Sequence, residues 1–247
     1  MKVLIVCSGT NVEQTFEHNH EFVYEQIQEL KKRKILFDIF LIRKKGILGY
    51  LKTRKRLLEK LKFGTYDLIH AHHGYSGMLA ALQLKCPVII TFIGCDINLF
   101  QSRLLSNVAI LLSKYNIFVS NELKNKTISK KGKSYVLPYG LDLTRIYPIN
   151  MYKAREELGL DANKNYCLFG SKKNRIEKNY ALAKKAVSLC DNTELIHLTG
   201  NYTREEVNLM INASNCILLT SLREGSPQII KEAMACNRPI ISTDVGD

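Results

Sequence analysis

The stretch from Cys216 to Gly246 most constrains the fold, because its pattern predicts a strand, a helix and a second strand in direct succession. Residues 216–220 and 239–243 are rich in leucine and β-branched side chains, and the segment between them has one apolar helical face. We expect Ser226 to cap this helix and Pro227 to occupy its first position, where no N–H is needed. A strand, a crossover helix and a strand form a parallel unit, so an α/β fold is predicted.

Two carboxylates belong to this stretch. Glu224 follows the first strand and Glu232 lies on the helix. In open parallel sheets, ligands bind at the carboxyl ends of the strands, and a helix N-terminus favours anions. An ionised carboxylate only accepts hydrogen bonds, and its two oxygens can take both hydroxyls of a diol. The two residues are therefore candidates for binding a ligand with hydroxyls and phosphate, and the alternative is a loop acid and a solvated helix acid.

The residues around these carboxylates resemble a known family. Glu-Gly-Ser-Pro at 224–227, Lys-Glu-Ala-Met-Ala-Cys-Asn-Arg-Pro at 231–239 and Ser-Thr-Asp-Val-Gly at 242–246 closely resemble the nucleotide-sugar signature of the retaining family 4 glycosyltransferases. That family has the GT-B fold, in which two Rossmann-like doubly wound domains with parallel sheets face a cleft. The resemblance implies that Glu224 holds hydroxyls of the donor sugar at the catalytic position and that Glu232 accepts from both ribose hydroxyls.

The segment 171–178 contributes basic residues to the expected donor-binding side of the site. It contains Lys172, Lys173, Arg175 and Lys178 beside a predicted helix. Cations at this place suit a diphosphate leaving group, whose charge grows as the glycosidic bond breaks. The resemblance implies that Lys178 and then Arg175 contact the donor phosphates, and a solvated basic turn is the alternative. The donor-binding residues implied are Glu232, Lys178, Arg175, Gly225, Ser226, Gly170 and Gly200.

The first half of the chain supplies the other side of the expected cleft. The segment 70–77, His-Ala-His-His-Gly-Tyr-Ser-Gly, resembles the strand end that lines the acceptor side in the family. His72 and His73 are candidates for binding sugar hydroxyls or for supporting departure of the leaving group. Ile93 stands where the family usually has a histidine, so the role of that histidine is not carried over. His70 is expected to be structural, and a metal site shared with His72 is the weaker alternative. The acceptor-side residues implied are Gly9, Gly74, Gly94 and Asp96.

Length and charge predict two domains. The 247 residues suffice for two Rossmann-sized domains, and we expect an acceptor-side domain at 1–148 and a nucleotide-sugar-binding domain at 149–247. Residues 1–148 hold 23 Lys and Arg against 11 Asp and Glu, whereas residues 149–247 hold 13 against 12. The second domain is shorter than the family's, so a C-terminally truncated fragment with an incomplete second domain is expected.

The segment 43–62 is the most basic part of the chain. Its leucines 48, 51, 58 and 61 fall near one side of a predicted helix, and lysines and arginines cover much of the rest. This pattern is typical of a helix that rests on an anionic membrane surface, and equally of an ordinary surface helix that packs on a sheet. The resemblance favours the membrane, because many such enzymes act on lipid-linked acceptors.

Several patterns are missing from the sequence. No apolar run approaches the roughly 20 residues that cross a bilayer, and the N-terminus becomes polar too soon for a secretory signal, so we expect a cytoplasmic protein, peripheral at the inner membrane face if it binds membranes. The seven cysteines form no CxxC pair, which indicates neither a zinc site nor a disulfide framework. The chain has no Asp-x-Asp, so cations and helix ends rather than a metal ion are expected to meet the charge of the diphosphate.

The resemblance thus predicts a retaining, metal-independent hexosyltransferase-type enzyme without a cofactor. It would move a sugar from a nucleotide-sugar donor, which is a substrate, to a glycan or lipid-linked acceptor in cell-surface polysaccharide or glycolipid biosynthesis. One alternative is a nucleotide-sugar epimerase of the same fold. Another is a basic nucleic-acid-binding module, which leaves Glu224 and Glu232 unexplained, so no nucleic-acid partner is expected. A third is a shortened chain that folds without activity.

Overall fold

The computed structural model describes residues 1–9, 21–43, 47–129, 133–200 and 202–247, without the side chains of residues 47, 48, 50 and 51. The described chain forms two compact units, Met1–Gly140 and Leu141–Gly246, each with its own parallel sheet. The predicted α/β class is confirmed. The units divide after Gly140, ahead of the division expected after residue 148.

The first unit contains a six-stranded sheet of order β2-β1-β3-β4-β5-β6, in which every neighbouring pair is parallel. Its strands are β1 (Lys2–Ser8), β2 (Leu36–Ile42), β3 (Leu68–His72), β4 (Val88–Phe92), β5 (Tyr115–Phe118) and β6 (Lys133–Val136). Residues of β1 alternate between two core clusters, with Leu4 and Val6 on one face and Val3 and Ile5 on the other. A strand that is buried on both faces has a continuous apolar sequence, and the sequence of β1 is of this kind.

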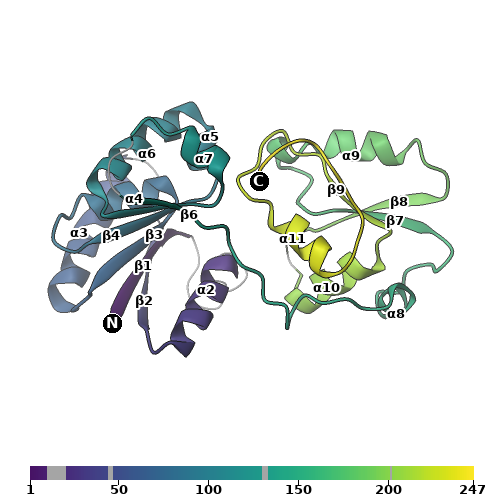
Figure 1. Cartoon of the computed structure of the whole chain (residues 1–247), viewed down its shortest axis with the longest axis horizontal. Coiled ribbons are helices and arrows are strands. Elements are labelled where there is room, and N and C mark those ends of the chain that lie inside the picture. The colour runs from purple at the N-terminus through teal and green to yellow at the C-terminus, as the bar shows by residue number, and fades with distance from the viewer. Residues whose placement is uncertain (10–20, 44–46, 130–132, 201) are drawn as a thin grey trace. The chain divides into compact units, whose positions relative to one another are not determined.

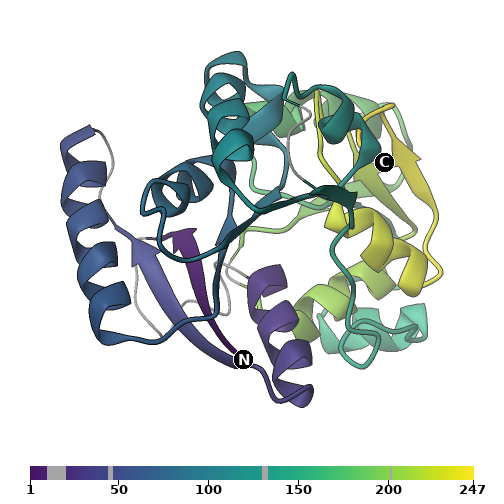
Figure 2. The same ribbon diagram turned by 60° about the vertical axis from the view of Figure 1, so that its left-hand side comes forward.

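Helices cover both faces of this sheet (Figure 1, Figure 2). They are α2 (Glu21–Lys32), α3 (Ile47–Phe63), α4 (Gly74–Ala81), α5 (Cys95–Asn98), α6 (Phe100–Leu112) and α7 (Asn121–Asn125). Helix α2 packs Val23 and Ile27 on one face, and α3, α4 and α6 form a layer on the opposite face, with α4 contacting both α3 and α6. Leu57 of α3 is fully buried in this layer and Leu61 packs against the same core, so this side of α3 faces the protein.

The second unit contains a four-stranded parallel sheet of order β10-β9-β7-β8. Its strands are β7 (Asn165–Phe169), β8 (Thr193–His197), β9 (Cys216–Leu219) and β10 (Ile240–Ser242), and its helices are α8 (Met151–Glu157), α9 (Tyr180–Val187), α10 (Arg204–Ala213) and α11 (Gln228–Ala235). Core clusters on the two faces hold Ala183 of α9 on one side and Ile211 and Ala233 of α10 and α11 on the other. Figure 1 shows the same division of these helices between the faces.

Two helix starts in this unit test the local sequence signals. Thr203 and Glu206 have the spacing of a capping box, and the structure forms it at α10: the Glu206 N–H donates to the Thr203 hydroxyl at 3.2 Å and the Thr203 N–H to the Glu206 carboxylate at 2.7 Å. The start predicted for α11 was one residue too early. Pro227 is the N-cap and the helix begins at Gln228, while the Ser226 hydroxyl accepts from the Lys231 ammonium group at 2.7 Å.

Among the described residues, no helix combines the length and the apolar character that crossing a bilayer requires.

Candidate active site

At the carboxyl edge of the second sheet, two of the predicted donor residues are in direct contact. The Lys178 ammonium group forms an ion pair with Oε1 of Glu224, and the Ser221 hydroxyl donates to the same oxygen at 2.6 Å. The Lys178 and Glu224 side chains are only 15% and 11% exposed. The loops that carry them are joined as well, because the Leu222 N–H donates to the Glu177 carbonyl at 2.8 Å. Parallel strands bring their following loops to one edge, which is how residues distant in sequence meet here.

This ion pair places the two chemical groups that a sugar phosphate needs beside each other. A carboxylate accepts from hydroxyls, and an ammonium group binds phosphate oxygens. Glu224 and Lys178 neutralise each other in the structure, so a ligand that carries both hydroxyls and phosphate can replace each partner with a group of its own. Ser221 was not predicted, although its place directly after a strand end is a signal that could have indicated it.

Glu232 lies on the side of α11 that faces α10, and it is 5% exposed. Its Oε1 accepts from Nη1 of Arg204 at 2.8 Å, and both side chains are 7% exposed. A buried carboxylate stays ionised only with such a partner, since desolvation strongly disfavours an unpaired charge. Among the described residues, the contacts of Glu232 involve Oε1, which leaves Oε2 to accept from a ligand. Arg204 was missed, because nothing in its local sequence shows that α10 packs beside α11.

The remaining donor-side residues surround this edge. Arg175 is exposed, and its Nη2 pairs with the Glu177 carboxylate at 2.6 Å rather than with Glu224. Gly225 is buried in the same loop as Glu224, next to Ser226. A Cβ added to Gly170 would lie 2.5 Å from the Ile229 side chain, so the end of β7 packs tightly on α11.

Gly200 follows β8 with a φ of +87°, and a Cβ there would lie 2.2 Å from Cε of Lys172. Both the left-handed conformation and this close approach favour glycine. The contact also brings the loop that follows β7 next to the loop that follows β8.

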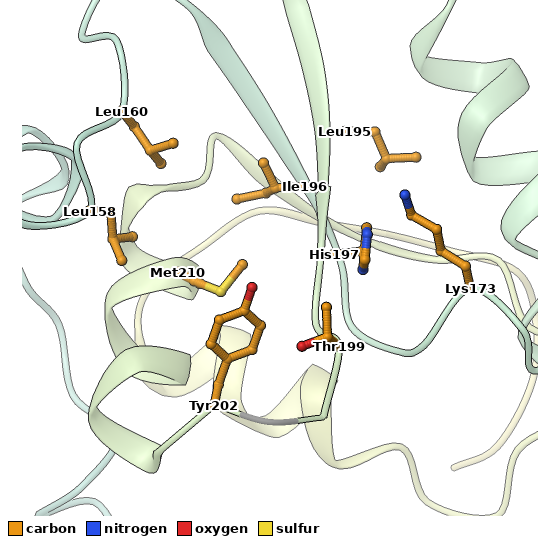
Figure 3. A pocket seen from close by; sticks show the side chains of 9 residues that line it. All are labelled: Leu158, Leu160, Lys173, Leu195, Ile196, His197, Thr199, Tyr202 and Met210. Carbon is orange, nitrogen blue, oxygen red and sulfur yellow. The ribbon is translucent and has the colours of Figure 1, made fainter.

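A cavity of about 480 Å³ opens beside β8 in the second unit, as Figure 3 shows. Its lining residues are Leu158, Leu160, Lys173, Leu195, Ile196, His197, Thr199, Tyr202 and Met210. The wall is mostly apolar with a few polar groups, which is the usual composition of a small-molecule pocket, and its volume lies in the usual range. Burial and the nearby Lys173 charge lower the pKa of His197, so its imidazole is neutral at pH 7.

In the first unit, two of the predicted histidines lie side by side on β3. The rings of His70 and His72 are 4.3 Å apart, as expected for residues on one face of a strand. His70 Nε2 lies 2.8 Å from the Thr91 hydroxyl, and burial lowers the His70 pKa to about 4. His72 is 3% exposed, and its Nδ1 lies 3.0 Å from the Tyr139 hydroxyl. Within the described part of the chain, no group of three or more His, Cys, Asp or Glu side chains could hold a metal ion.

His73 leaves the strand in a left-handed conformation, with a φ of 79°, and caps α4. Its Nδ1 accepts from the Tyr75 N–H at 3.3 Å, and its Nε2 lies 3.3 Å from Sγ of Cys95. Cys95 is exposed and was not predicted as part of the site. The pair places an imidazole and a thiol at the carboxyl ends of two neighbouring strands, β3 and β4.

Asp96 holds these two strand ends together. It is fully buried, and its carboxylate accepts from the Gly74 N–H at 3.0 Å and the Gly94 N–H at 2.8 Å. The same carboxylate accepts from the N–H of Ile93, the residue that replaces the family histidine. The structure thus brings Gly74, Gly94 and Asp96 together, with Asp96 in a scaffolding position. Gly9 follows β1 and donates to the Ile42 carbonyl at 3.1 Å.

Comparison with family models identifies both units. Residues 2–145 match the model described as Glycosyltransferase Family 4, and residues 154–247 match the model described as Glycosyl transferases group 1. The chain belongs to Glycosyltransferase Family 4. This confirms that the chain is a glycosyltransferase, as the sequence around Glu224 and Glu232 indicated.

Glycosyltransferases named among the curated relatives are about a quarter identical to the chain over the aligned residues. It is 26% identical over 213 residues to TuaC of Bacillus subtilis, a glycosyltransferase named for teichuronic acid biosynthesis. It is 24% identical over 265 residues to a D-inositol 3-phosphate glycosyltransferase of Pseudarthrobacter chlorophenolicus. These alignments cover 73% and 83% of this chain. The chain spans only 54% and 62% of the length of those relatives.

Solved structures confirm the GT-B fold. Sucrose-phosphate synthase from Thermosynechococcus elongatus superposes with a TM-score of 0.73 at 16% identity, over 98% of this chain and 82% of that one. HepE from Anabaena, solved in complex with UDP and glucose, gives a TM-score of 0.71 at 16% identity, over 100% of this chain and 81% of that one. At this identity the likeness establishes the fold alone.

Proposed function

We propose that this glycosyltransferase chain moves a sugar from a nucleotide-sugar donor to a glycan or lipid-linked acceptor with retention of anomeric configuration. The observation that carries the proposal is the ion pair of Lys178 and Glu224 at the carboxyl edge of the second sheet. Family membership supports the reaction class, and the UDP and glucose bound to HepE are ligands of the kind that such an edge suits. Retention of configuration rests on the sequence resemblance.

On the donor side, the proposed roles are those that the sequence resemblance implies, and the observed contacts support them. Glu224 accepts hydrogen bonds from the sugar hydroxyls, and Lys178 turns to the diphosphate and neutralises its growing charge during bond cleavage. Arg175 adds a second cation when it exchanges Glu177 for a phosphate. Oε2 of Glu232 accepts from the ribose, while Arg204 keeps Oε1 compensated.

The 480 Å³ cavity beside β8 suits the base of the donor nucleotide. Its apolar wall and the ring of Tyr202 can cover the faces of a planar heterocycle, and Lys173 and Thr199 can bond to its edge. Lys172, the neighbour of Lys173, packs over Gly200. This contact places the pocket next to the loop after β7 that leads to Lys178.

On the acceptor side, His72 and His73 are proposed to bind acceptor or sugar hydroxyls, or to assist the leaving group. Lys178 and Arg175 neutralise the charge of the diphosphate leaving group, in keeping with a chain that has no Asp-x-Asp. Similarity to TuaC supports a place in cell-surface polysaccharide biosynthesis. We propose a cytoplasmic enzyme, since nucleotide sugars are made there.

The first test measures donor binding, because binding can be measured even if the chain does not catalyse transfer. Calorimetric titration with UDP-glucose should give measurable affinity that Lys178→Gln weakens by about 2 kcal/mol, the scale of a hydrogen bond to a charged group. Lys184→Gln, an exposed lysine on α9, is the matched control and should bind as the unchanged chain does. Other nucleotide diphosphate sugars should be screened in parallel. Equal binding by the Lys178→Gln variant would remove Lys178 from the site.

Product analysis then separates transfer from epimerisation. Free nucleotide diphosphate that appears only when an acceptor is added supports transfer. A changed sugar that is still attached to its nucleotide would favour the epimerase instead.

A further inference from the structure

Helix α6 exposes a row of large apolar side chains, while its buried side holds Ser102, Ser106 and Asn107 beside Ala109 and Ile110. Six large hydrophobic residues face solvent, from Phe100 at 70% exposed to Val108 and Leu112 at 41%; the others are Leu104, Leu105 and Leu111. At about 100° per residue, these six positions fall within an arc of about 140°. Leu99, just before the helix, is 40% exposed and extends the same face. Contiguous exposed apolar patches of this kind mark interaction surfaces.

Hydrogen bonds on the inner side of α6 fix the rotation of the helix about its axis. The leucine face is therefore held toward solvent. The Ser102 hydroxyl lies 2.8 Å from the Tyr75 hydroxyl, and the Ser106 hydroxyl donates to the Asp96 carbonyl at 2.9 Å. The Asn107 side chain accepts from the backbone N–H groups of residues 128 and 129 at 2.8 and 2.9 Å. Turning the helix to bury its leucines would break all of these bonds.

A basic row lies in the same helical layer. Helix α3 occupies the other side of α4 and exposes Lys52, Arg54, Lys55 and Arg56. Its packed side holds Leu57, and its exposed side carries these basic residues, with Phe63 at its last position 85% exposed. Lys114 is exposed just after α6. Within α3 and α6 as described, Glu59 is the one acidic residue.

We propose that this face of the first unit, α6 with the basic row of α3, docks on an anionic lipid bilayer. The leucines and Phe100 of α6 enter the boundary between headgroups and acyl chains, and α3 adds attraction to anionic headgroups. Charge favours lipid over a second copy of the chain, because a two-fold dimer through α6 would bring two basic rows to one interface. The sequence had placed membrane contact on the leucines of α3, whereas this face uses α6 for insertion.

The surface stands independently of the transferase activity, but it adjoins the acceptor side. Asp96, which holds the ends of β3 and β4, is four residues before Phe100, and its carbonyl accepts from the Ser106 hydroxyl of α6. A bilayer that holds α6 would therefore lie close to the loops proposed to bind a lipid-linked acceptor.

The chain contains no tryptophan, so a single introduced indole reports its own surroundings. Phe100→Trp and Leu104→Trp replace exposed residues of α6, and Leu189→Trp replaces an 80% exposed residue of the second unit as a matched control. With phosphatidylcholine vesicles containing phosphatidylglycerol, emission of the two α6 reporters should shift to the blue while the control stays unchanged. Vesicles without phosphatidylglycerol, or added salt, should reduce the shift. A control that shifts as much as the α6 reporters would overturn the proposal.

Flotation of the unchanged chain provides the second arm. The double variant Leu104→Gln, Leu111→Gln should lower the vesicle partition constant about tenfold, because two inserting side chains are lost. Leu182→Gln, Leu189→Gln in the second unit is the matched control and should float as the unchanged chain does. Thermal unfolding of both variants shows that they are folded. A chain that does not float but forms dimers that the α6 variant abolishes would assign this face to a second copy and reject the lipid proposal.

Discussion

Arg204 and Glu232 form a buried ion pair, and the two residues lie on different helices. Arg204 is the first residue of α10, where the capping box fixes the backbone, and Glu232 is in the middle of α11. The pair therefore exists only when both helices are packed on the same face of the sheet. Its loss should affect stability and donor binding in separable ways.

We expect Arg204→Gln to lower the free energy of unfolding by about 3 kcal/mol, because Glu232 is then a buried charge without its partner. The double variant Arg204→Gln, Glu232→Gln should regain much of this loss, since two neutral amides replace the charges. Urea unfolding of the four proteins in this cycle measures the coupling. Additive losses would show that the pair contributes nothing as a pair.

Donor affinity gives the second readout of this pair. Glu232→Gln is expected to weaken nucleotide-sugar binding by about 1 to 3 kcal/mol, since a charged acceptor is lost. Arg204→Lys should restore affinity in part relative to Arg204→Gln, because a cation again faces the carboxylate. Affinity for UDP-glucose that is unchanged in Glu232→Gln would remove this residue from the site.

His70 should make stability depend on pH. Burial lowers its pKa to about 4, while the unfolded chain binds the same proton near pH 6.5. The neutral imidazole thus contributes stability that is fully present above about pH 6.5 and is lost as the pH falls toward 4. Between pH 6.5 and 5 the loss is about 2 kcal/mol. In His70→Gln, urea unfolding should show a pH dependence that is weaker by this amount, and an equal dependence in both proteins would contradict the assignment.

Residues of the candidate site were predictable where they follow a strand within a recognisable motif. Glu224 and Lys178 both do, and the structure brings them into contact. Arg204 and Cys95 were not predictable, since each matters through a partner that only tertiary packing supplies: Glu232 for one and His73 for the other. Local sequence carries no information about such pairs.

At the scale of elements, the sequence signals for helix N-termini differ in how reliably they predict where a helix begins. The capping box at α10 satisfies two backbone N–H groups reciprocally, so sequence and structure agree there. At α11, Ser226 and Pro227 were predicted as the N-cap and the first helical residue, whereas in the structure Pro227 is the N-cap and the helix begins at Gln228.

Thr203→Ala should therefore lower the free energy of unfolding by about 1 kcal/mol, the usual contribution of an N-cap hydroxyl. Thr65→Ala, an exposed threonine outside any helix or strand, is the matched control and should change stability little. Chemical denaturation followed by circular dichroism measures both. Equal stabilities would show that α10 is held by packing alone.

The two amphipathic helices show where pattern reading is ambiguous. In α3, apolar and basic residues alternate so that the apolar stripe packs, which hydrophobic periodicity predicts. In α6, serines and an asparagine take the inner side, because they bond to groups that surround Asp96 and to the backbone after α7. A periodicity argument assigns the leucines to the core, and only the polar partners reverse that assignment.

At the scale of the whole molecule, the strand, helix and strand predicted for 216–246 are present, because inner parallel strands give continuous apolar runs. Both sheets are parallel and have the doubly wound strand order that the family implied. The division between the units was less well specified, since the connection after Gly140 contains no helix or strand up to Met151.

The contact between Lys178 and Glu224 has a consequence for which ligands the site prefers. A nucleoside diphosphate would engage the ammonium group and leave the carboxylate, 11% exposed, without its counter-charge. A free sugar would do the opposite. Only a molecule that carries a sugar on its diphosphate compensates both groups, because the ribose hydroxyls are proposed to bind Glu232, so the intact donor should outcompete its own product. Each round of transfer would then end with lysine and glutamate rejoining as the spent nucleotide leaves, and the protein itself would help to clear the site.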